Sequence, residues 1–446
     1  MRRTIVLFTT MALTVLVASG VALAVTKIGS AGAQSSVVGP GESIQKAVNA
    51  AHPGDTIVVR GVHREDVVIR KNGIKLRGDD AVIEAPTRAK ADSPCSRAVG
   101  RPEAICVFGD VNINTGKLTG QRVSDVSVSG FTIRGFKIKG KGDNSALVID
   151  VYAARNATVV GNRITGNVAG GIGAGRSVNT TVAKNHVIGS PETDTEGIAV
   201  SGDSRNTKVV NNVVRGISGS RNARNAIEVE ESIDTTVAGN DLIDDWLGVF
   251  VENSTGTKIL SNDISRSGYA GIFMVGPKPA NAKVVGNNIS GGAWGIDVVD
   301  TKRGSFAGNN IHDNCAGMFF DAFESQPVDD FEVKGNTVEN NTHSCRAAQF
   351  GANFSGIGIA LHGASGMEVT GNHLSGNVPS GPTPVSGGVV VSADPFFGGT
   401  TKPTNNSVIG NHFGPNKPDI FWDGSGSGNS FLGNLCDTSV PSSLCN

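Results

Sequence analysis

The stretch VVGNNISGGAWGIDVVDTKRGS at residues 284–305 decides the fold, because its pattern returns along the chain. The flanking segments ILSNDISRSGYAGIFMVG (259–276) and FAGNNIHDNCAGMFFDAF (306–323) repeat its central Asn and the Gly-rich strand-like segment that follows. The Asn recurs about every 27 residues, a period typical of repeat architectures. Its positions are Asn162, Asn185, Asn212, Asn240, Asn262, Asn287, Asn309, Asn336, Asn372, Asn411 and Asn434.

Each repeat also contains a short segment of strictly alternating apolar residues, such as GIFMV (271–275) and GIDVV (295–299). Alternation of period two indicates a half-buried strand, and the Gly before it indicates a turn. No segment of helical period lies between the repeats. The pattern therefore predicts an all-β solenoid in which each repeat makes one coil and the Asn side chains stack at one turn. Propeller blades, at ~40 residues, are longer than this repeat.

The motif V-x-G-N-x-I with G-I-x-V resembles the right-handed parallel β-helix repeat of the pectate-lyase-like (pectin lyase fold) superfamily. The N-terminal stretch ESIQKAVNAAHPGDTIVVRGVHREDVVIRKNGIKLRGDDAVI (42–83) resembles that superfamily's opening. The resemblance covers roughly residues 39–436. It implies a single-stranded right-handed parallel β-helix with an N-terminal amphipathic helix as a cap. It does not imply one activity, because this fold hosts lyases, hydrolases, epimerases, esterases and inert surface proteins.

Five segments follow from these patterns. We predict a signal peptide and short leader at 1–33, a cap and first coils at 39–85, a disulfide-tied insertion at 86–122, the β-helix at 123–436 and a Cys-closed cap at 437–446. The leader has two Arg, an apolar run and small residues, with cleavage after Ala24 or Ala33, so we expect a secreted protein with no membrane segment in its mature form. An uncleaved N-terminal anchor is the alternative.

The six cysteines suggest disulfides, because an even number in an exported chain is typical of a disulfide framework. Proximity in the sequence favours three pairs: Cys95–Cys106, Cys315–Cys345 and Cys436–Cys445. The sequence contains no CxxC motif and no cluster of Cys and His, so it does not predict a metal site. A net charge of −1 and only 18% charged residues argue against nucleic acid as a partner.

The outward positions of the alternating strand are where a ligand would bind. We place Val148, Gly173 and Ala199 at the start of one outward column, and Asp150, Gly175 and Ser201 at the start of the other. The predicted substrate-binding residues are Glu228, Phe250, Phe273 and Phe319, and the predicted catalytic residues are Glu230, Glu252, Asp297, Asp321 and His362. Outward aromatic rings suit stacking against sugars. The alternative is that the long turns 339–356, 375–387 and 394–406 roof the Phe side chains.

Carboxylates on neighbouring coils have the spacing of a glycosidase pair. Glu230 and Glu252 would lie near the ~5 Å of a retaining pair, and Asp297 and Asp321 about 8 Å apart, within the inverting range. Solvated surface acids or calcium ligands are the alternative reading, so Ca²⁺ is a possible but not a required cofactor.

We therefore expect a protein that binds and processes a polysaccharide or cell-surface glycan, by glycoside hydrolysis or transglycosylation. A non-catalytic extracellular scaffold or adhesin is one alternative, and a Ca-dependent polysaccharide lyase or epimerase is another. Elimination is disfavoured because neither outward column contains the Arg or Lys that uronate chemistry needs. The GHG and RIK signature of polygalacturonases is also absent.

Overall fold

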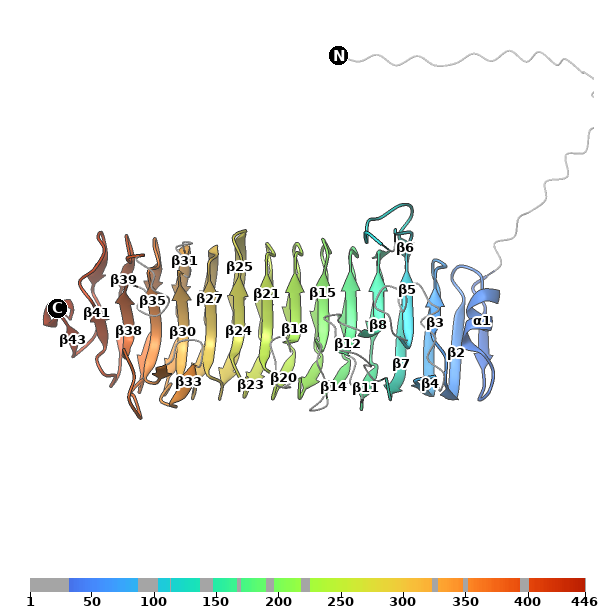
Figure 1. The fold of residues 1–446 in the computed structure, drawn as a ribbon, viewed down its shortest axis with the longest axis horizontal. Coiled ribbons are helices and arrows are strands. Elements are labelled where there is room, and N and C mark those ends of the chain that lie inside the picture. Colours follow the sequence, from blue (N-terminus) through green and yellow to red (C-terminus); the bar gives the residue numbers. More distant parts are fainter. Residues whose placement is uncertain are drawn as a thin grey trace, which may run out of the picture. The chain divides into compact units, whose positions relative to one another are not determined.

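The computed structural model describes residues 32–86, 103–112, 114–136, 147–166, 170–189, 196–217, 225–322, 328–347, 352–393 and 401–445. Residues 33–446 form one compact unit, a stack of coils built from parallel strands (Figure 1). The predicted all-β solenoid is confirmed. The predicted leader and Cys95 lie outside the described residues, apart from the last two leader residues.

Each full coil contributes one strand to each of three faces. The face of the candidate site is a sheet of fourteen parallel strands, here named the site sheet, and its register runs without a break from strand to strand. Its members are β3 (Val67–Ile69), β5 (Ile105–Phe108), β8 (Leu147–Tyr152), β12 (Gly170–Gly175), β15 (Ile198–Ser201), β18 (Asn225–Glu230), β21 (Leu247–Glu252), β24 (Ala270–Val275), β27 (Trp294–Val299), β30 (Ala316–Asp321), β35 (Ile357–His362), β38 (Gly387–Ser392), β41 (Ile420–Trp422) and β43 (Ser439–Val440).

The other two faces are joined into one sheet of 25 strands, because the long first strands run across both of them. Those long strands are β2 (Thr56–His63), β4 (Lys75–Glu84) and β7 (Ser127–Arg134), with β1 (Ser35–Val38) at the outer edge. The face before the ladder Asn holds β10 (Thr158–Val160), β13 (Thr181–Ala183), β16 (Lys208–Val210), β19 (Thr236–Ala238), β22 (Lys258–Leu260), β25 (Pro279–Val285), β28 (Lys302–Ala307), β31 (Asp329–Lys334), β36 (Glu368–Thr370), β39 (Ser407–Ile409) and β42 (Ser430–Leu432). The face after it holds β11 (Arg163–Thr165), β14 (His186–Ile188), β17 (Val213–Arg215), β20 (Asp241–Ile243), β23 (Asp263–Ser265), β26 (Asn288–Ser290), β29 (Asn310–His312), β32 (Thr337–Glu339), β37 (His373–Ser375) and β40 (His412–Phe413).

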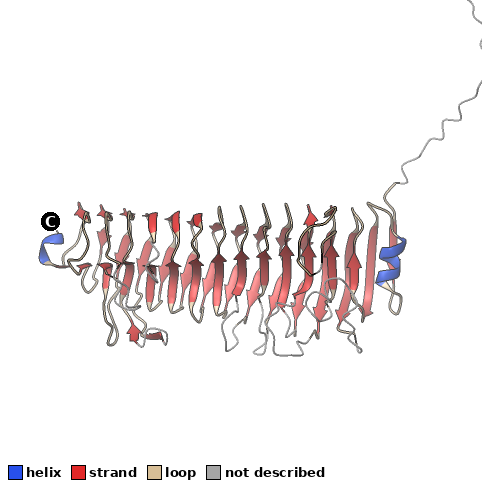
Figure 2. Cartoon of the chain, turned by 45° about the horizontal axis from the view of Figure 1, so that its top comes forward, coloured by secondary structure: helices blue, strands red, loops and turns tan. Residues whose placement is uncertain are grey.

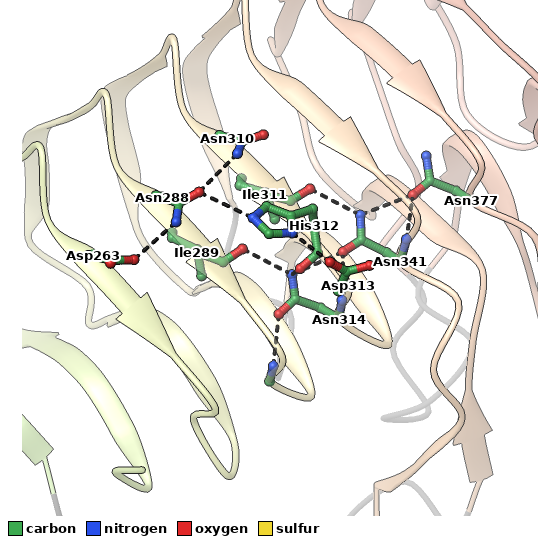
Figure 3. A network of polar contacts seen from close by, with 11 residues as sticks. Asp263, Asn288, Ile289, Asn310, Ile311, His312, Asp313, Asn314, Asn341 and Asn377 are labelled. Carbon is green, nitrogen blue, oxygen red and sulfur yellow. Dashed lines mark hydrogen bonds and ion pairs between the residues drawn. The ribbon is translucent and has the colours of Figure 1, made fainter. Parts of the chain in front are cut away.

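The repeated Asn side chains form a buried ladder at the turn between these last two faces. Asn262 shows the unit: its backbone N–H and its Nδ2 both donate to Oδ1 of Asn287 at 2.9 Å, and its Nδ2 also donates to the Val237 carbonyl at 3.0 Å. A second, shorter ladder runs through Asn314, Asn341 and Asn377 (Figure 3). The amides satisfy turn backbone groups that would otherwise be buried without partners.

The left-handed backbone conformation at this turn is not adopted by the ladder Asn itself. The residue before each ladder Asn has positive φ, as in Gly286 (66°) and Lys184 (55°), whereas the Asn itself does not. The role of the Asn is therefore the hydrogen bonding of its side-chain amide. The preceding residue, most often Gly, adopts the left-handed conformation.

The two ends of the stack differ in structure. At the N-terminal end, helix α1 (Ile44–Ala50) buries Ile44 and Val48 in the core, and the Ser43 side chain accepts a hydrogen bond from the Lys46 N–H. At the C-terminal end, β43 and the short helix η3 (Ser442–Leu444) lie in the segment that the Cys436–Cys445 disulfide closes into a loop.

Two of the predicted disulfides are observed, Cys315–Cys345 and Cys436–Cys445. Cys106 is also disulfide-bonded, but its predicted partner lies outside the described residues. Segment 86–122 is not purely an insertion, because its residues Ile105–Phe108 form β5, which pairs with β3 and β8 as one coil of the site sheet. Sequence reasoning missed this coil because it lacks the ladder Asn.

Two pairs of short strands lie outside the three faces, one antiparallel and one parallel. The hairpin of β33 (Cys345–Ala347) and β34 (Ala352–Phe354) extends below the stack in the view of Figure 2. The pair β6 (Val123–Ser124) and β9 (Ala154–Arg155) lies at the turn next to the first coils (Figure 1).

Candidate functional site

The two predicted outward columns exist on the site sheet from β12 onwards, with Gly173 beside Ala199 and Gly175 beside Ser201. Register pairs Glu228 with Phe250, Phe250 with Phe273, Phe273 with Asp297 and Asp297 with Phe319. Two residues along, Glu230 pairs with Glu252, and Asp321 pairs with His362. The alternating inward residues of the same strands, such as Ile272 and Met274, belong to the main core.

The start of the columns differs from our alignment by two residues. Asp150 pairs with Gly173 and Tyr152 with Gly175, so Asp150 belongs to the first column and Val148 to neither. The strand LVIDVY lacks the Gly found at the start of most of the aligned strands, and this misled the alignment.

Three glutamates form an acidic cluster on β18 and β21. Glu228, Glu230 and Glu252 are all partly exposed, and Asn225 Nδ2 donates to Glu228 Oε2 at 2.6 Å. Burial raises the pKa of Glu228 to about 8, and the nearby Glu196 carboxylate adds to the shift. Burial and then the charge of Glu252 raise the pKa of Glu230. Two carboxyl groups of this cluster are therefore biased towards the protonated form.

Asp297 is buried beneath aromatic side chains rather than open to solvent. It is 4% exposed, and the Tyr269 hydroxyl donates to its Oδ2 at 2.8 Å. Burial raises the pKa of Asp297 to about 7, although the Tyr269 hydrogen bond acts in the opposite direction.

Asp321 and His362 are buried too, so the predicted exposed pair Asp297 and Asp321 does not face an open groove. Asp321 is 3% exposed, and His362 is fully buried with its ring stacked on Phe319 at 4.9 Å. Burial lowers the pKa of His362 to about 4, so it is neutral at physiological pH. The prediction of solvent-accessible groups fails here because all three side chains are buried.

The aromatic side chains divide into an accessible and a covered group. Phe250 and Phe273 are half-buried and stack at 5.6 Å with an interplanar angle of 21°. Phe319 is 2% exposed and lies against Phe354, at 5.8 Å between ring centroids, and Phe354 belongs to the β33–β34 hairpin that Cys345 ties to Cys315.

The alternative that long turns roof the Phe side chains therefore holds for Phe319. Turn 339–356 supplies Phe354, and Val385 of turn 375–387 packs against the same cluster. The first part of turn 394–406 lies outside the described residues.

Sequence reasoning missed three aromatic residues that lie beside Phe250 and Phe273. Trp246 stacks on Tyr269 (5.9 Å, 24°), and Tyr269 contacts Trp294 at 5.0 Å. Trp246 is 38% exposed, so this group of aromatic rings reaches solvent. The signal was present, because each residue begins or directly precedes a site-sheet strand on three successive coils, but we aligned only positions within the strands.

Among the described residues, no group of three or more His, Cys, Asp or Glu side chains is arranged to hold a metal ion. In the same part of the chain, no helix has the length and apolar character needed to cross a membrane. The disulfides are typical of proteins from oxidising compartments.

Comparison with known proteins supports the architecture. Residues 225–413 match the family model described as right handed beta helix region. The protein is a right-handed parallel β-helix of the pectin lyase fold. No curated protein matches the chain significantly.

Solved structures with a similar fold share little sequence with this β-helix. The catalytic unit of a GH87 α-1,3-glucanase from Streptomyces thermodiastaticus aligns with a TM-score of 0.56 and 14% identity, over 92% of this chain and 70% of that one. The A-module of mannuronan C-5 epimerase AlgE6 from Azotobacter vinelandii aligns with a TM-score of 0.49 and 15% identity, over 89% of this chain and 94% of that one. PfbA, a surface adhesin of Streptococcus pneumoniae, aligns with a TM-score of 0.49 and 14% identity, over 87% of each chain.

Proposed function

We propose that this protein is a secreted β-helix that binds a polysaccharide along the site sheet and cleaves or transfers it with Glu230 and Glu252. One observation carries the proposal. Glu230 and Glu252 lie side by side in register, both partly exposed, and the charge of Glu252 helps to raise the pKa of Glu230.

The two carboxyl groups suit the roles of a retaining glycosidase. Neighbouring strands lie about 4.8 Å apart, close to the ~5 Å between the carboxyl groups of a retaining pair. Glu230 in its protonated form donates its proton to the glycosidic oxygen, and ionised Glu252 attacks the anomeric carbon. Water, or a second sugar hydroxyl, then displaces Glu252 from the glycosyl intermediate while Glu230 accepts the proton.

Neighbouring groups supply binding. Glu228, with its pKa of about 8, is largely protonated at neutral pH and can donate a hydrogen bond to a sugar hydroxyl. The rings of Phe250 and Phe273, and of Trp246 and Tyr269, offer flat apolar surfaces against which sugar rings stack.

A neutral glycan fits this cluster better than a uronate. Three glutamates lie together, and the outward positions of β18 to β38 include no Arg or Lys to receive a sugar carboxylate. This favours hydrolysis or transglycosylation over a lyase or epimerase reaction. The glucanase neighbour supports the proposal only in showing that this fold accommodates glycoside cleavage.

The test is release of reducing ends from a panel of neutral and acidic glycans. We expect release from a neutral glycan, and a loss of at least about a hundredfold in kcat for Glu230→Gln and for Glu252→Gln. Glu368→Gln, which removes an exposed carboxylate on β36, should retain full activity. Unchanged activity in both site variants would reject these two residues as the pair.

A second candidate function is glycan binding without catalysis, as in a scaffold or adhesin. It is favoured by the burial of Asp297, Asp321 and His362, because among the predicted catalytic residues only Glu230 and Glu252 are then exposed to a ligand. Under this function no glycan in the panel is cleaved, yet Trp246→Ala weakens glycan binding measured by calorimetry.

A further inference from the structure

A cluster of four arginines lies on a turn face near the N-terminal coils, outside the strands β18 and β21 that carry the acidic cluster. Pairing of β6 with β9 places Ser124 beside Arg155, and parallel bridges continue from Arg155 to Val178 and from Val178 to Arg205. Arg155 and Arg205 are therefore two coils apart in one column. By the same register Arg122 and Arg176 are two coils apart in a column two residues earlier.

The guanidinium groups lie close enough to influence one another. The Arg122 side chain donates to the Arg176 carbonyl, and Arg176 Nε donates to the Tyr152 hydroxyl at 3.0 Å. Burial lowers the pKa of Arg122, and the charges of Arg155, Arg176 and Arg205 add to the shift. Like charges gathered in this way carry an electrostatic cost, which a bound anion would relieve.

Few ion pairs engage these arginines within the described residues. Arg176 has one distant carboxylate, Asp203 at 3.7 Å. Within the described part of the chain, Arg122, Arg155 and Arg205 make no ion pair. The nearest acid on the neighbouring hairpin, Asp110, is already engaged by Arg70 and by the Gln121 N–H, both at 3.1 Å.

A cavity of about 430 Å³ lies between the hairpin and the coils, with Arg122 and Arg155 on its wall. Its other polar lining comes from Asn72, Gln121 and Ser124. The hairpin is held by the bridge between Val111 and Leu118, and Figure 1 shows it beside β6. Two arginines and three uncharged polar residues therefore line one concave, predominantly polar space.

We propose that this cavity binds the carboxylate or sulfate groups of an anionic saccharide. Arg122 and Arg155 contact one oxyanion, and Arg205 contacts a second about 10 Å farther along the stack, the rise of two coils. Planar guanidinium groups suit two-point hydrogen bonding to an oxyanion. A saccharide chain is favoured over a free ion because the charges are arranged in columns along the stack. This site is independent of the glutamate pair.

The proposal is tested by calorimetric titration of the full mature chain with oligogalacturonate, a sulfated oligosaccharide, a neutral oligosaccharide, inorganic phosphate and a single-stranded oligonucleotide. We expect one of the anionic oligosaccharides to bind and the neutral one not to bind. Arg155→Gln should weaken that binding roughly tenfold, and Arg155→Gln with Arg205→Gln more than that. Added salt should weaken it further.

Arg163→Gln is the matched control, because Arg163 is an exposed arginine on β11 with no ion pair in the described structure. Arg163→Gln should leave the affinity for the anionic oligosaccharide unchanged. Because the substituted arginines are exposed, the unfolding temperatures of all variants should match that of the parent protein. Three results would each overturn the proposal: no binding of either anionic oligosaccharide, equal weakening by Arg163→Gln, or phosphate or the oligonucleotide binding as tightly as the oligosaccharide. Loss of glycan cleavage in Glu252→Gln with normal anion binding would show that the two sites are separate.

Discussion

At the scale of single residues, the repeat is maintained by hydrogen bonding more than by side-chain volume. The ladder residues are 8% exposed or less, and each side-chain amide bonds to two backbone groups of the preceding coil, as that of Asn262 does to the Val237 carbonyl and the Asn240 N–H. A residue that could fill the same space without these donors and acceptors would leave buried polar groups without partners.

Asn262→Ala should therefore destabilise the fold strongly. The substitution removes the acceptor of the Asn240 N–H and side chain and the donor to the Val237 carbonyl. We expect the free energy of unfolding to fall by about 3 kcal/mol or more, as measured by urea denaturation. Asn310→Ala is the control: its exposed amide donates only to Asn288, so its loss should cost less than about 1 kcal/mol. Equal costs would contradict a structural role for the buried ladder.

Asp297 should make stability depend on pH. Its pKa is about 7 in the folded chain and near 3.9 in the unfolded chain, so between these values the folded chain holds a proton that the unfolded chain has lost. The free energy of unfolding therefore falls as pH rises from about 4 to about 7, by up to roughly 4 kcal/mol.

Asp297→Asn should flatten that dependence, and denaturant unfolding at several pH values measures it. Asp263→Asn, at an exposed position on β23, should keep the slope of the parent protein. If Asp297→Asn ran parallel to the parent from pH 4 to 8, the buried carboxyl would not titrate in this range.

At the scale of elements, the β33–β34 hairpin decides which part of the site sheet is accessible. Its Phe354 lies against Trp294 and Phe319, and the Cys315–Cys345 disulfide ties its first strand to the residue just before β30. The covered half of the sheet thus becomes a second small core, whereas β18, β21 and β24 keep partly exposed outward residues.

Phe354→Ala should uncover this second core. Phe354 is 1% exposed, so its truncation should cost about 3–5 kcal/mol of local stability, and acrylamide should quench Trp fluorescence more strongly once Trp294 is reached. Leu432→Ala, at a side chain that is 62% exposed, should change neither property. Unaltered quenching in Phe354→Ala would show that the hairpin does not shield Trp294.

At the scale of the whole molecule, stability is distributed along the stack, because each coil contacts its two neighbours. The first coil has a neighbour on one side only, and Ile44 and Val48 of α1 pack at that end. An end without such cover would expose apolar core and invite association with another chain.

Val48→Asp tests this role of α1. A charge at this buried position should detach the helix, so we expect a lower unfolding temperature and association through the exposed end, measured by light scattering. Ala50→Asp introduces the same charge at an exposed helix position and should remain like the parent. A monomeric Val48→Asp variant of normal stability would show that the end needs no cover.

The coil period, the outward columns from Gly173 and two disulfides could be predicted from the sequence. They depend on local rules that repeat: Asn at one turn, alternation in one strand, and cysteines close in sequence. The coil that holds β5 and the register of β8 could not, because those segments lack the repeated residues and take their place only by pairing with their neighbours.

Accessibility was decided by the tertiary structure alone. Asp297, Asp321 and Phe319 stand at outward positions as the alternation requires, yet all three are buried, Asp297 against Tyr269 and Phe319 against Phe354. The alternation carries no information about such contacts. The arginine cluster likewise arises because residues from Arg122 to Arg205 are brought together by stacking. The sequence by itself determined which way each strand residue points, because strand alternation is local; which of those residues meet solvent depended on contacts between distant segments, which only the folded chain contains.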